Sequence, residues 1–306
     1  MVRAAVGGWG FGSGARRRAA AVLEEATERL AAAGVRTPRL DAECLLAAAL
    51  RCDRAALYGR REVLPAEAAG RFAALLERRA AREPVAYLTG TREFWSLPLT
   101  VTPAVLIPRP ETETLVEAIL ECLADRAAAP LTIADLGTGC GAIAIALAVE
   151  LKEARIVATD VSPEALAVAA ENARRFRVDG RITFLRGDFT APLFAANLTG
   201  ALDALVANPP YIPTAELEAL EPEIVGFEPH LALDGGPDGL AFHRALAATA
   251  PRLLRPGGWL AVEVGAGQAR AVRSLLAASP GLAVHAVVRD LAHRDRVCLA
   301  RREAAG

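Results

Sequence analysis

The chain has 306 residues, of which 53% are hydrophobic and 23% charged. This length and composition predict a globular protein of about two domains and argue against a disordered chain. The formal net charge of −1 lacks the positive excess that general binding to nucleic acid or to a membrane surface requires, so neither is expected as a direct partner.

The charge is unevenly distributed along the chain. Residues 1–84 contain 15 arginines and 10 acidic residues, a net charge of +5, whereas residues 85–306 contain 20 basic and 26 acidic residues, a net charge of −6. Lys152 is the only lysine, and we attribute this bias toward arginine to codon usage. The distribution predicts two domains of opposite charge.

Cysteine spacing and the length of the apolar runs indicate the compartment. No two of the five cysteines have CxxC spacing, so we expect buried, reduced thiols and no bound metal. The longest apolar run, Ala142–Val149, is far shorter than the roughly 20 residues that span a bilayer. Residues 1–18 lack the apolar core of a secretory signal and are expected to form a flexible tail, with an organellar transit peptide as the alternative. We therefore expect a cytoplasmic protein.

Residues 19–84 have the apolar periodicity of a small helical domain. The first helical stripe ends near Gly34, and Pro38 is well suited to the first position of the next helix. Further helices are expected after Asp53 and after Pro65. The exposed arginines of this domain make it a candidate docking surface for an acidic partner.

Residues 85–108 change from helical to β-prone character. The run Phe94–Val101 is interrupted by Pro98 and predicts a short β-hairpin. Prolines 103, 108 and 110 keep the following stretch extended. We expect this segment to link the helical domain to a second domain at residues 109–306.

In the second domain, β-prone runs alternate with helical stretches, which predicts a parallel sheet covered by helices on both faces. The last two β-prone runs are separated by seven residues, too few for a helical crossover, so they are expected to pair antiparallel. The expected strands are Leu131–Leu136, Arg155–Thr159, Ile182–Arg186, Leu202–Ala207, Trp259–Val264, Ala283–Val288 and Arg296–Ala300. The expected helices are residues 111–124, 141–152, 163–176 and 239–254.

A glycine-rich loop, Asp135–Gly141 (DLGTGCG), follows the first of these strands and precedes a helix. Such a loop lets the backbone lie against a ligand at a helix N-terminus. The spacing of its glycines fits a dinucleotide-binding fingerprint as well as other nucleoside cofactors. Asp160, at the end of the second strand, can accept hydrogen bonds from ribose hydroxyls in either case.

Two features favour S-adenosylmethionine over a dinucleotide. The charge of Asp135 would repel a pyrophosphate but suits a ligand that carries an amino group and a sulfonium. Asp188 can accept a hydrogen bond from an adenine amino group, and the ring or the backbone N–H of Phe189 can contact the base. With the terminal antiparallel hairpin, these features are typical of a Rossmann-like class I methyltransferase.

The segment Asn208–Tyr211 (NPPY) directly follows the fourth strand, at the edge where ligands bind in open α/β sheets. A planar amide or aromatic amino nitrogen is a poor nucleophile and must be oriented with its lone pair toward the methyl group. The side-chain oxygen of Asn208 and the carbonyl of Pro209, stiffened by Pro210, can accept from its two N–H groups. Tyr211 can place its ring against the substrate or against developing positive charge. These four residues are the candidate catalytic and substrate-binding residues.

With these motifs the chain resembles the bacterial release factor glutamine methyltransferases over about residues 20–302. The resemblance implies methylation of the side-chain amide nitrogen (N5) of the glutamine in the Gly-Gly-Gln motif of class 1 peptide chain release factors. It also implies that S-adenosylmethionine is the cofactor. The residues that carry the resemblance are Pro84–Gly90, Glu93–Trp95, Leu106–Glu113, Asp135–Gly141, Asn208–Tyr211, Phe227–His230, Gly235–Gly239 and Asp290–Val297. The expected cofactor-binding residues are Asp135, Gly137, Thr138, Gly139, Cys140, Gly141, Asp160, Asp188, Phe189 and Asn208.

Other activities remain as alternatives. The nearest are methylation of a glutamine in a ribosomal protein, which Pro110–Thr112 argues against, and methylation of adenine N6 in DNA, which the net charge of −6 argues against. A dinucleotide-dependent oxidoreductase and a non-enzymatic binding module are the remaining alternatives. The chain has no clear signal for an oligomer and is expected to be a monomer.

Overall fold

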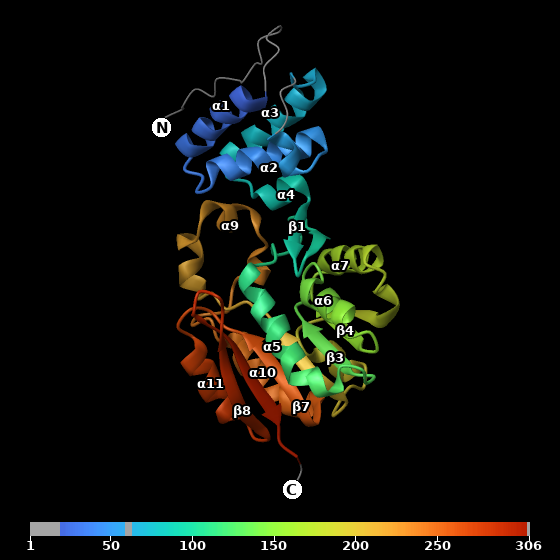
Figure 1. Cartoon of the computed structure of the whole chain (residues 1–306). Coiled ribbons are helices and arrows are strands. Elements are labelled where there is room, and N and C mark those ends of the chain that lie inside the picture. Colours follow the sequence, from blue (N-terminus) through green and yellow to red (C-terminus); the bar gives the residue numbers. More distant parts are fainter. Residues whose placement is uncertain (1–18, 59–62, 305–306) are drawn as a thin grey trace. The chain divides into compact units, whose positions relative to one another are not determined.

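The structure, a computed structural model, describes residues 19–58 and 63–304 (Figure 1). Contacts divide the chain into two compact units, Met1–Gly90 and Thr91–Gly306. The tail expected at residues 1–18 lies outside the described residues. The segment expected to be a linker, residues 85–108, is shared between the two units, because its first residues belong to a helix of the first unit.

The described part of the first unit is helical. Leu45 and Leu46 pack with Phe72 and Leu76, and all four side chains are fully buried. The proline-based predictions for the helix starts are confirmed, because α2 begins at Pro38 and α3 directly follows Pro65. The elements are α1 (Ala19–Ala32), α2 (Pro38–Leu50), the 3-10 helix η1 (Arg54–Leu57), α3 (Ala66–Ala80) and α4 (Val85–Thr89).

A buried ion pair joins two helices of this unit. Arg79 of α3 donates from Nε to Asp41 Oδ2 of α2 at 2.7 Å, and the two side chains are only 6% and 9% exposed. The other Asp41 oxygen accepts from the Thr37 hydroxyl at 2.8 Å, just before the start of α2. One carboxylate therefore serves both the helix start and the packing of α2 on α3.

The second unit begins with the expected hairpin, β1 (Thr91–Phe94) and β2 (Leu97–Thr100). Its two turn residues, Trp95 and Ser96, both have positive φ, a conformation typical of tight two-residue hairpin turns. The Asn172 side chain accepts from the Thr100 backbone N–H at 2.8 Å and donates to the Cys140 carbonyl at 2.9 Å. The hairpin is thereby connected to the glycine-rich loop.

The core of the second unit is a seven-stranded sheet in the order β5-β4-β3-β6-β7-β9-β8. The first five of these strands are parallel, and β9 is antiparallel to both of its neighbours. The expected mostly parallel Rossmann-like sheet with a terminal antiparallel hairpin is therefore confirmed. The strands are β3 (Thr132–Leu136), β4 (Arg155–Asp160), β5 (Ile182–Arg186), β6 (Leu202–Ala207), β7 (Leu254–Glu263), β8 (Leu282–Arg289) and β9 (Asp295–Arg302).

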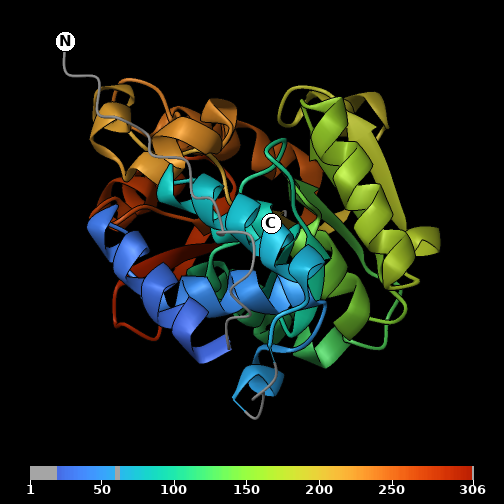
Figure 2. The same ribbon diagram turned by 90° about the horizontal axis from the view of Figure 1, so that it is seen from above.

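Helices cover both faces of the sheet. The four helices expected from periodicity are present as α5 (Glu113–Leu123), α6 (Ala142–Glu150), α7 (Pro163–Arg175) and α10 (Ala241–Leu253). Leu136 and Leu205 pack with α10 and α11 in one buried cluster, while the alternate residue Asp135 lies on the other face and bonds α6. In Figure 2, α7 and the orange segment 214–232 lie on opposite flanks of this unit. The remaining elements are α8 (Ala191–Ala195), α9 (Pro222–Phe227), α11 (Ala269–Ala277) and the 3-10 helices η2 (Pro110–Thr112), η3 (Ala124–Arg126), η4 (Asp179–Arg181), η5 (Thr214–Ala219) and η6 (His230–Ala232).

Strand β7 differs from the expectation, because it begins at Leu254 rather than at Trp259. The intervening Pro-Gly-Gly run is typical of a turn, but here the strand continues through an irregular register. A Cβ at Gly258 would lie 2.8 Å from the Leu202 carbonyl oxygen, so glycine permits this close approach of the two backbones. Helix α11 was also not predicted, although Ala269, Val272 and Leu276 form its buried face.

The thiols are only partly as expected. Cys140 and Cys298 are buried, whereas Cys44, Cys52 and Cys122 are partly exposed, and all five are free. Among the described residues, no helix combines the length and the apolar character needed to cross a bilayer.

Replacing Asp41 by alanine should destabilise the first unit by about 3 kcal/mol or more, because the Arg79 charge stays buried without its carboxylate. Hydrogen exchange followed by mass spectrometry would measure this as lost protection in peptides of α2 and α3. Glu67→Ala is the matched control, because its pair with Arg71 is exposed and is worth about 1 kcal/mol or less. Equal protection in the two variants would contradict the prediction.

Candidate active site

The carboxyl ends of the five parallel strands meet at one edge of the sheet and bring most of the expected site residues together. The glycine-rich loop follows β3, Asp160 ends β4, Asp188 follows β5 and Asn208 follows β6. In open α/β sheets, ligands bind at this edge. The arrangement explains how residues separated by more than seventy positions in sequence reach one site.

The glycine-rich loop uses its glycines for backbone conformation. Gly137, Gly139 and Gly141 have φ values of 67°, 56° and 85°, a left-handed region that other residues rarely adopt. A Cβ at Gly141 would also lie 3.1 Å from the Ala169 Cβ, so glycine permits close packing of α6 on α7. At Gly137 and Gly139 a Cβ would meet no atom within 4 Å, which leaves open space beside the loop.

Asp160 holds this loop through its carboxylate. Its two oxygens accept from the backbone N–H groups of Gly139, at 2.9 Å, and Ser162, at 3.0 Å. Ser162 in turn caps α7 by accepting from the Ala165 N–H. Each carboxylate oxygen has further acceptor capacity, so Asp160 can bind hydroxyls while it holds the loop.

Asp135 is fully buried below the same loop. Its Oδ2 accepts from the Thr138 hydroxyl at 2.6 Å and from the Ala144 N–H at 3.2 Å, while Oδ1 has no hydrogen-bond partner among the described residues. Burial is the main reason that the Asp135 pKa rises to about 7. Cys140 is also buried, which raises its thiol pKa to about 12 and leaves it neutral.

Asp188 and Phe189 differ in exposure. The Asp188 side chain is exposed and can reach a ligand. The Phe189 ring packs edge-on against Phe242, with ring centroids 5.3 Å apart, and lies half-buried against the core cluster. Of the two contacts expected for Phe189, its backbone N–H is therefore the better candidate.

The NPPY segment places two polar side chains together at the end of β6. Asn208 donates from Nδ2 to the Thr112 hydroxyl oxygen at 3.0 Å, and the Tyr211 hydroxyl donates to Glu263 at 3.5 Å. Pro209 is buried and Pro210 is half-buried. Burial raises the pKa of Tyr211 to about 12, so its hydroxyl remains a hydrogen-bond donor at neutral pH.

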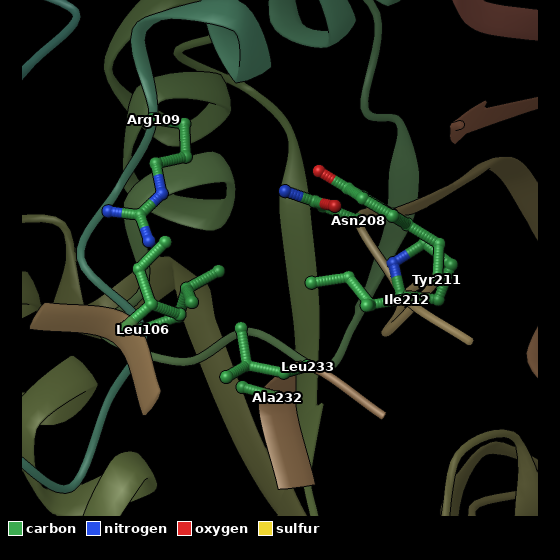
Figure 3. A pocket seen from close by; sticks show the side chains of 9 residues that line it. Leu106, Arg109, Asn208, Tyr211, Ile212, Ala232 and Leu233 are labelled. Carbon is green, nitrogen blue, oxygen red and sulfur yellow. The ribbon is translucent and has the colours of Figure 1, made fainter. Parts of the chain in front are cut away.

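Asn208 and Tyr211 line a pocket of about 130 Å³. In Figure 3 the two side chains extend in the same direction, and Arg109 and Leu106 lie across the pocket from them. Pockets for drug-sized ligands are larger, roughly 300–1,000 Å³, so this one suits a single side chain. The lining residues are Leu106, Arg109, Asn208, Pro209, Tyr211, Ile212, Ile224, Ala232 and Leu233.

Arg109 is held in the pocket wall by Glu228. The Arg109 guanidinium pairs with Glu228 Oε1, and the other oxygen accepts from the Ile107 backbone N–H at 3.1 Å. Glu228 is only 4% exposed. The segments 106–113 and 227–230, which are far apart in sequence, therefore meet at one buried carboxylate.

The backbone of Tyr211 is supported from behind by two glycines and one glutamine. A Cβ at Gly235 would lie 2.8 Å from the Tyr211 Cα, and one at Gly239 would lie 2.3 Å from the Tyr211 carbonyl oxygen. That carbonyl accepts from Gln268 Nε2 at 2.8 Å, and Gly265 holds the Gln268 side chain through Oε1 at 2.9 Å. The position of the NPPY segment is thus fixed by close backbone packing.

Comparison with known proteins identifies the family. Residues 21–90 match the model of the PrmC N-terminal domain, and residues 112–225 match the methyltransferase small domain. The release factor glutamine methyltransferase of Moorella thermoacetica is 54% identical over 92% of this chain and 97% of its own length. The chain belongs to the release factor glutamine methyltransferase family. The enzyme of that name from Cereibacter sphaeroides is 48% identical over 94% of this chain and 100% of its own length.

A solved structure shares the fold at lower identity. The hMettl16 catalytic domain, solved in complex with the MAT2A 3′UTR hairpin 6, matches with a TM-score of 0.52 and 17% identity, over 76% of this chain and 82% of that chain. The likeness shows the methyltransferase fold alone.

The buried polar groups of this family member fit S-adenosylmethionine. The unpartnered Asp135 oxygen lies below a loop with open space beside it. A ligand with an ammonium or sulfonium group lowers the cost of ionising this carboxyl, whereas a pyrophosphate raises it. The donor and acceptor set at this edge therefore suits the cofactor that the methyltransferase domain implies.

Sequence reasoning missed several residues of this site, namely Arg109, Thr112, Glu263 and Gln268. Glu263 had the clearest signal, because it is a charged residue at the end of an apolar strand, at the ligand-binding edge. The role of Thr112 could not be found, because it depends on a contact with Asn208, 96 positions away.

The Asp135 pKa predicts a pH-dependent stability. Because the folded-state pKa, about 7, lies above the ordinary aspartate value of 3.8, the carboxyl destabilises the cofactor-free fold progressively as pH rises between these two values. Asp135→Asn removes this titration. The unfolding temperature of the variant, relative to wild type, should therefore rise by at least about 2–4 °C between pH 5 and pH 8. Asp125→Asn, at an exposed site, is the control, and an equal change in both variants would contradict the assignment.

Proposed function

We propose that the chain methylates the side-chain amide nitrogen (N5) of the glutamine in the Gly-Gly-Gln motif of class 1 peptide chain release factors. Family membership supports this reaction, since the relatives are named release factor glutamine methyltransferases. The observation that carries it is the Asn208 amide. Its nitrogen is engaged by Thr112, so its oxygen is left to accept a hydrogen bond from a substrate amide in the pocket.

The NPPY residues, Asn208–Tyr211, mainly orient the substrate nitrogen. The Asn208 oxygen and the Pro209 carbonyl each accept from one N–H of the glutamine amide, which holds the nitrogen lone pair in one direction. Pro210 restrains the backbone of this segment. The Tyr211 ring lies in the pocket wall and stabilises positive charge that develops on the nitrogen. Held in this way, the nitrogen reacts with a high effective molarity.

Proton transfer requires no residue of its own. The amide nitrogen, once methylated, releases a proton to water, so a strong general base is unnecessary. Tyr211 keeps its own proton, since burial raises its pKa.

The cofactor-binding residues form a second group beside the pocket. S-adenosylmethionine supplies an electrophilic methyl group when bound. Asp135 complements its positive charge, Asp160 accepts from the ribose hydroxyls, and Asp188 with the Phe189 backbone contacts the base. The full proposed set is Asp135, Gly137, Thr138, Gly139, Cys140, Gly141, Asp160, Asp188, Phe189 and Asn208.

We further propose that the first unit docks the release factor. One glutamine side chain offers too little surface for specific recognition, so a protein substrate must also bind elsewhere. The net charge of +5 over residues 1–84 supports an acidic partner surface. We also propose that the enzyme acts in the cytoplasm as a monomer, on a protein substrate rather than on nucleic acid.

Removal of residues 1–90 tests the docking role. The truncated enzyme should lose at least about tenfold in kcat/KM for an intact release factor, since the docking contacts lower the energy of its complex. A short Gly-Gly-Gln peptide is the control substrate, because its kcat/KM should stay within about twofold and also report that the second unit is folded. Equal kcat/KM values for the intact factor with both enzymes would contradict the docking role.

Mass spectrometry of a release factor incubated with enzyme and S-adenosylmethionine tests the function itself. The expected product carries one methyl group on the Gly-Gly-Gln glutamine, located by fragmentation. Asn208→Ala should lower kcat by about 100-fold or more, because the glutamine nitrogen loses an orienting acceptor. Asn197→Ala, at an exposed position, is the matched control. A methyl group elsewhere, or none, would refute the proposed function.

A further inference from the structure

A buried carboxylate without a stated role, Glu263, lies below the NPPY segment. It ends strand β7 and is 1% exposed. The Tyr211 hydroxyl lies 3.5 Å from Oε1, and Oε2 has no partner that meets the geometry of a full hydrogen bond among the described residues. The Thr112 hydroxyl stabilises the ionised form and so lowers the Glu263 pKa. The contact with Tyr211 is long, as is common in an enzyme without its substrate.

Thr112 connects this carboxylate to Asn208. Its hydroxyl has one proton to donate and can accept at its oxygen. The oxygen already accepts from Asn208 Nδ2 at 3.0 Å. The proton is therefore available for another acceptor, and the Glu263 carboxylate, whose ionised form this hydroxyl stabilises, can be that acceptor.

The charge of Glu263 decides the direction of this chain of hydrogen bonds. An ionised carboxylate can only accept, so the Thr112 proton points to Glu263 and the Thr112 oxygen can only accept from Asn208. The Asn208 amide must then present its nitrogen to Thr112 and its oxygen to the pocket. A protonated Glu263 can donate to Thr112 instead, which frees the Thr112 proton for Asn208 and allows the amide to turn over. The Asn208 nitrogen would then face the N–H groups of the glutamine, donor against donor.

We propose that Glu263 is a positioning residue which, through the Thr112 hydroxyl, keeps the Asn208 oxygen turned toward the substrate glutamine. The inference rests on the proposed function, because it assigns the Asn208 oxygen the task of accepting from the glutamine amide. Glu263 acts without touching the substrate itself.

The side chains around Glu263 determine its pKa. Burial is the largest cause that raises its pKa, to about 7, and Glu111 of η2 acts in the same direction. Arg296 of β9 and the hydroxyls of Thr112 and Tyr211 lower it. Two further titratable side chains lie next to these groups. They are His243 of α10, whose Nε2 lies 3.0 Å from the Glu263 backbone oxygen, and Asp290, which pairs with Arg296.

The ionisation of Glu263 should make kcat depend on pH. Above about pH 7 Glu263 is ionised and the Asn208 oxygen faces the pocket, so kcat is at its plateau. As pH falls through 7, the carboxyl is protonated and kcat decreases. Asp135 titrates in the same range, so the cofactor is kept saturating and Asp135→Asn is assayed in parallel to show that the decrease persists without it.

Steady-state methylation of a release factor by the full-length enzyme, from pH 6 to pH 8.5, tests the proposal. Thr112→Val removes the hydroxyl with little change in shape and should lower kcat at pH 8 by about 10–100-fold, with the KM for cofactor within about threefold. Thr112→Ser restores the hydroxyl and should recover most of kcat and the decrease at low pH. Glu263→Gln cannot titrate and should have a flat profile between pH 6 and pH 8. Thr249→Val, at a half-buried position of α10 far from the NPPY segment in sequence, is the control for a Thr-to-Val change.

The outcomes separate this inference from the proposed function. Wild-type enzyme that methylates no glutamine refutes the function. Wild-type enzyme that does methylate it, together with wild-type kcat in Thr112→Val or an unchanged pH profile in Glu263→Gln, refutes the positioning role alone. If circular dichroism shows that Thr112→Val is unfolded, the profiles of Thr112→Ser and Glu263→Gln decide.

Discussion

The hydrogen bond from the Asn208 amide nitrogen to Thr112 is the interaction on which the site depends. It joins the end of β6 to the short helix η2, and it leaves the Asn208 oxygen available in the pocket. The side-chain amide of Asn208 can rotate, so a shift of Asn208 or of Thr112 would turn the amide oxygen away from the pocket. Much of the second unit serves to hold these two elements at hydrogen-bonding distance.

Two sets of contacts hold the NPPY segment and η2 in this arrangement. On the NPPY side, glycine backbones at Gly235 and Gly239 approach Tyr211 more closely than any side chain would allow, and Gln268 binds its carbonyl. On the η2 side, Glu228 binds the backbone of Ile107 and the guanidinium of Arg109. Both supports use buried, fully directed contacts, which place the site with little freedom to relax.

The same edge of the sheet contains two buried carboxyl groups, Asp135 and Glu263, each with one oxygen that lacks a full hydrogen bond. Burial raises both pKa values to about 7. In a protein selected for stability alone, such groups would be replaced or fully paired. Their presence at the ligand-binding edge indicates that stability is sacrificed for function there.

Local signals in the sequence determined most of the fold and selected the candidate site residues. Alternating β and helical periodicity predicted the seven strands, and prolines and glycines predicted helix starts and the loop after β3, because these residues act through their own backbone conformation. Asp135, Asp160 and Asn208 could be selected because each lies within or directly after the last two residues of a predicted strand. Only the tertiary structure decided that Phe189 packs against the core, that Gly258 carries β7 through an irregular pairing, and that Thr112 and Glu228 bond residues that line the pocket. The reason is physical: these roles depend on contacts between segments tens of residues apart, and periodicity along the chain contains no information about which distant side chain will be the partner.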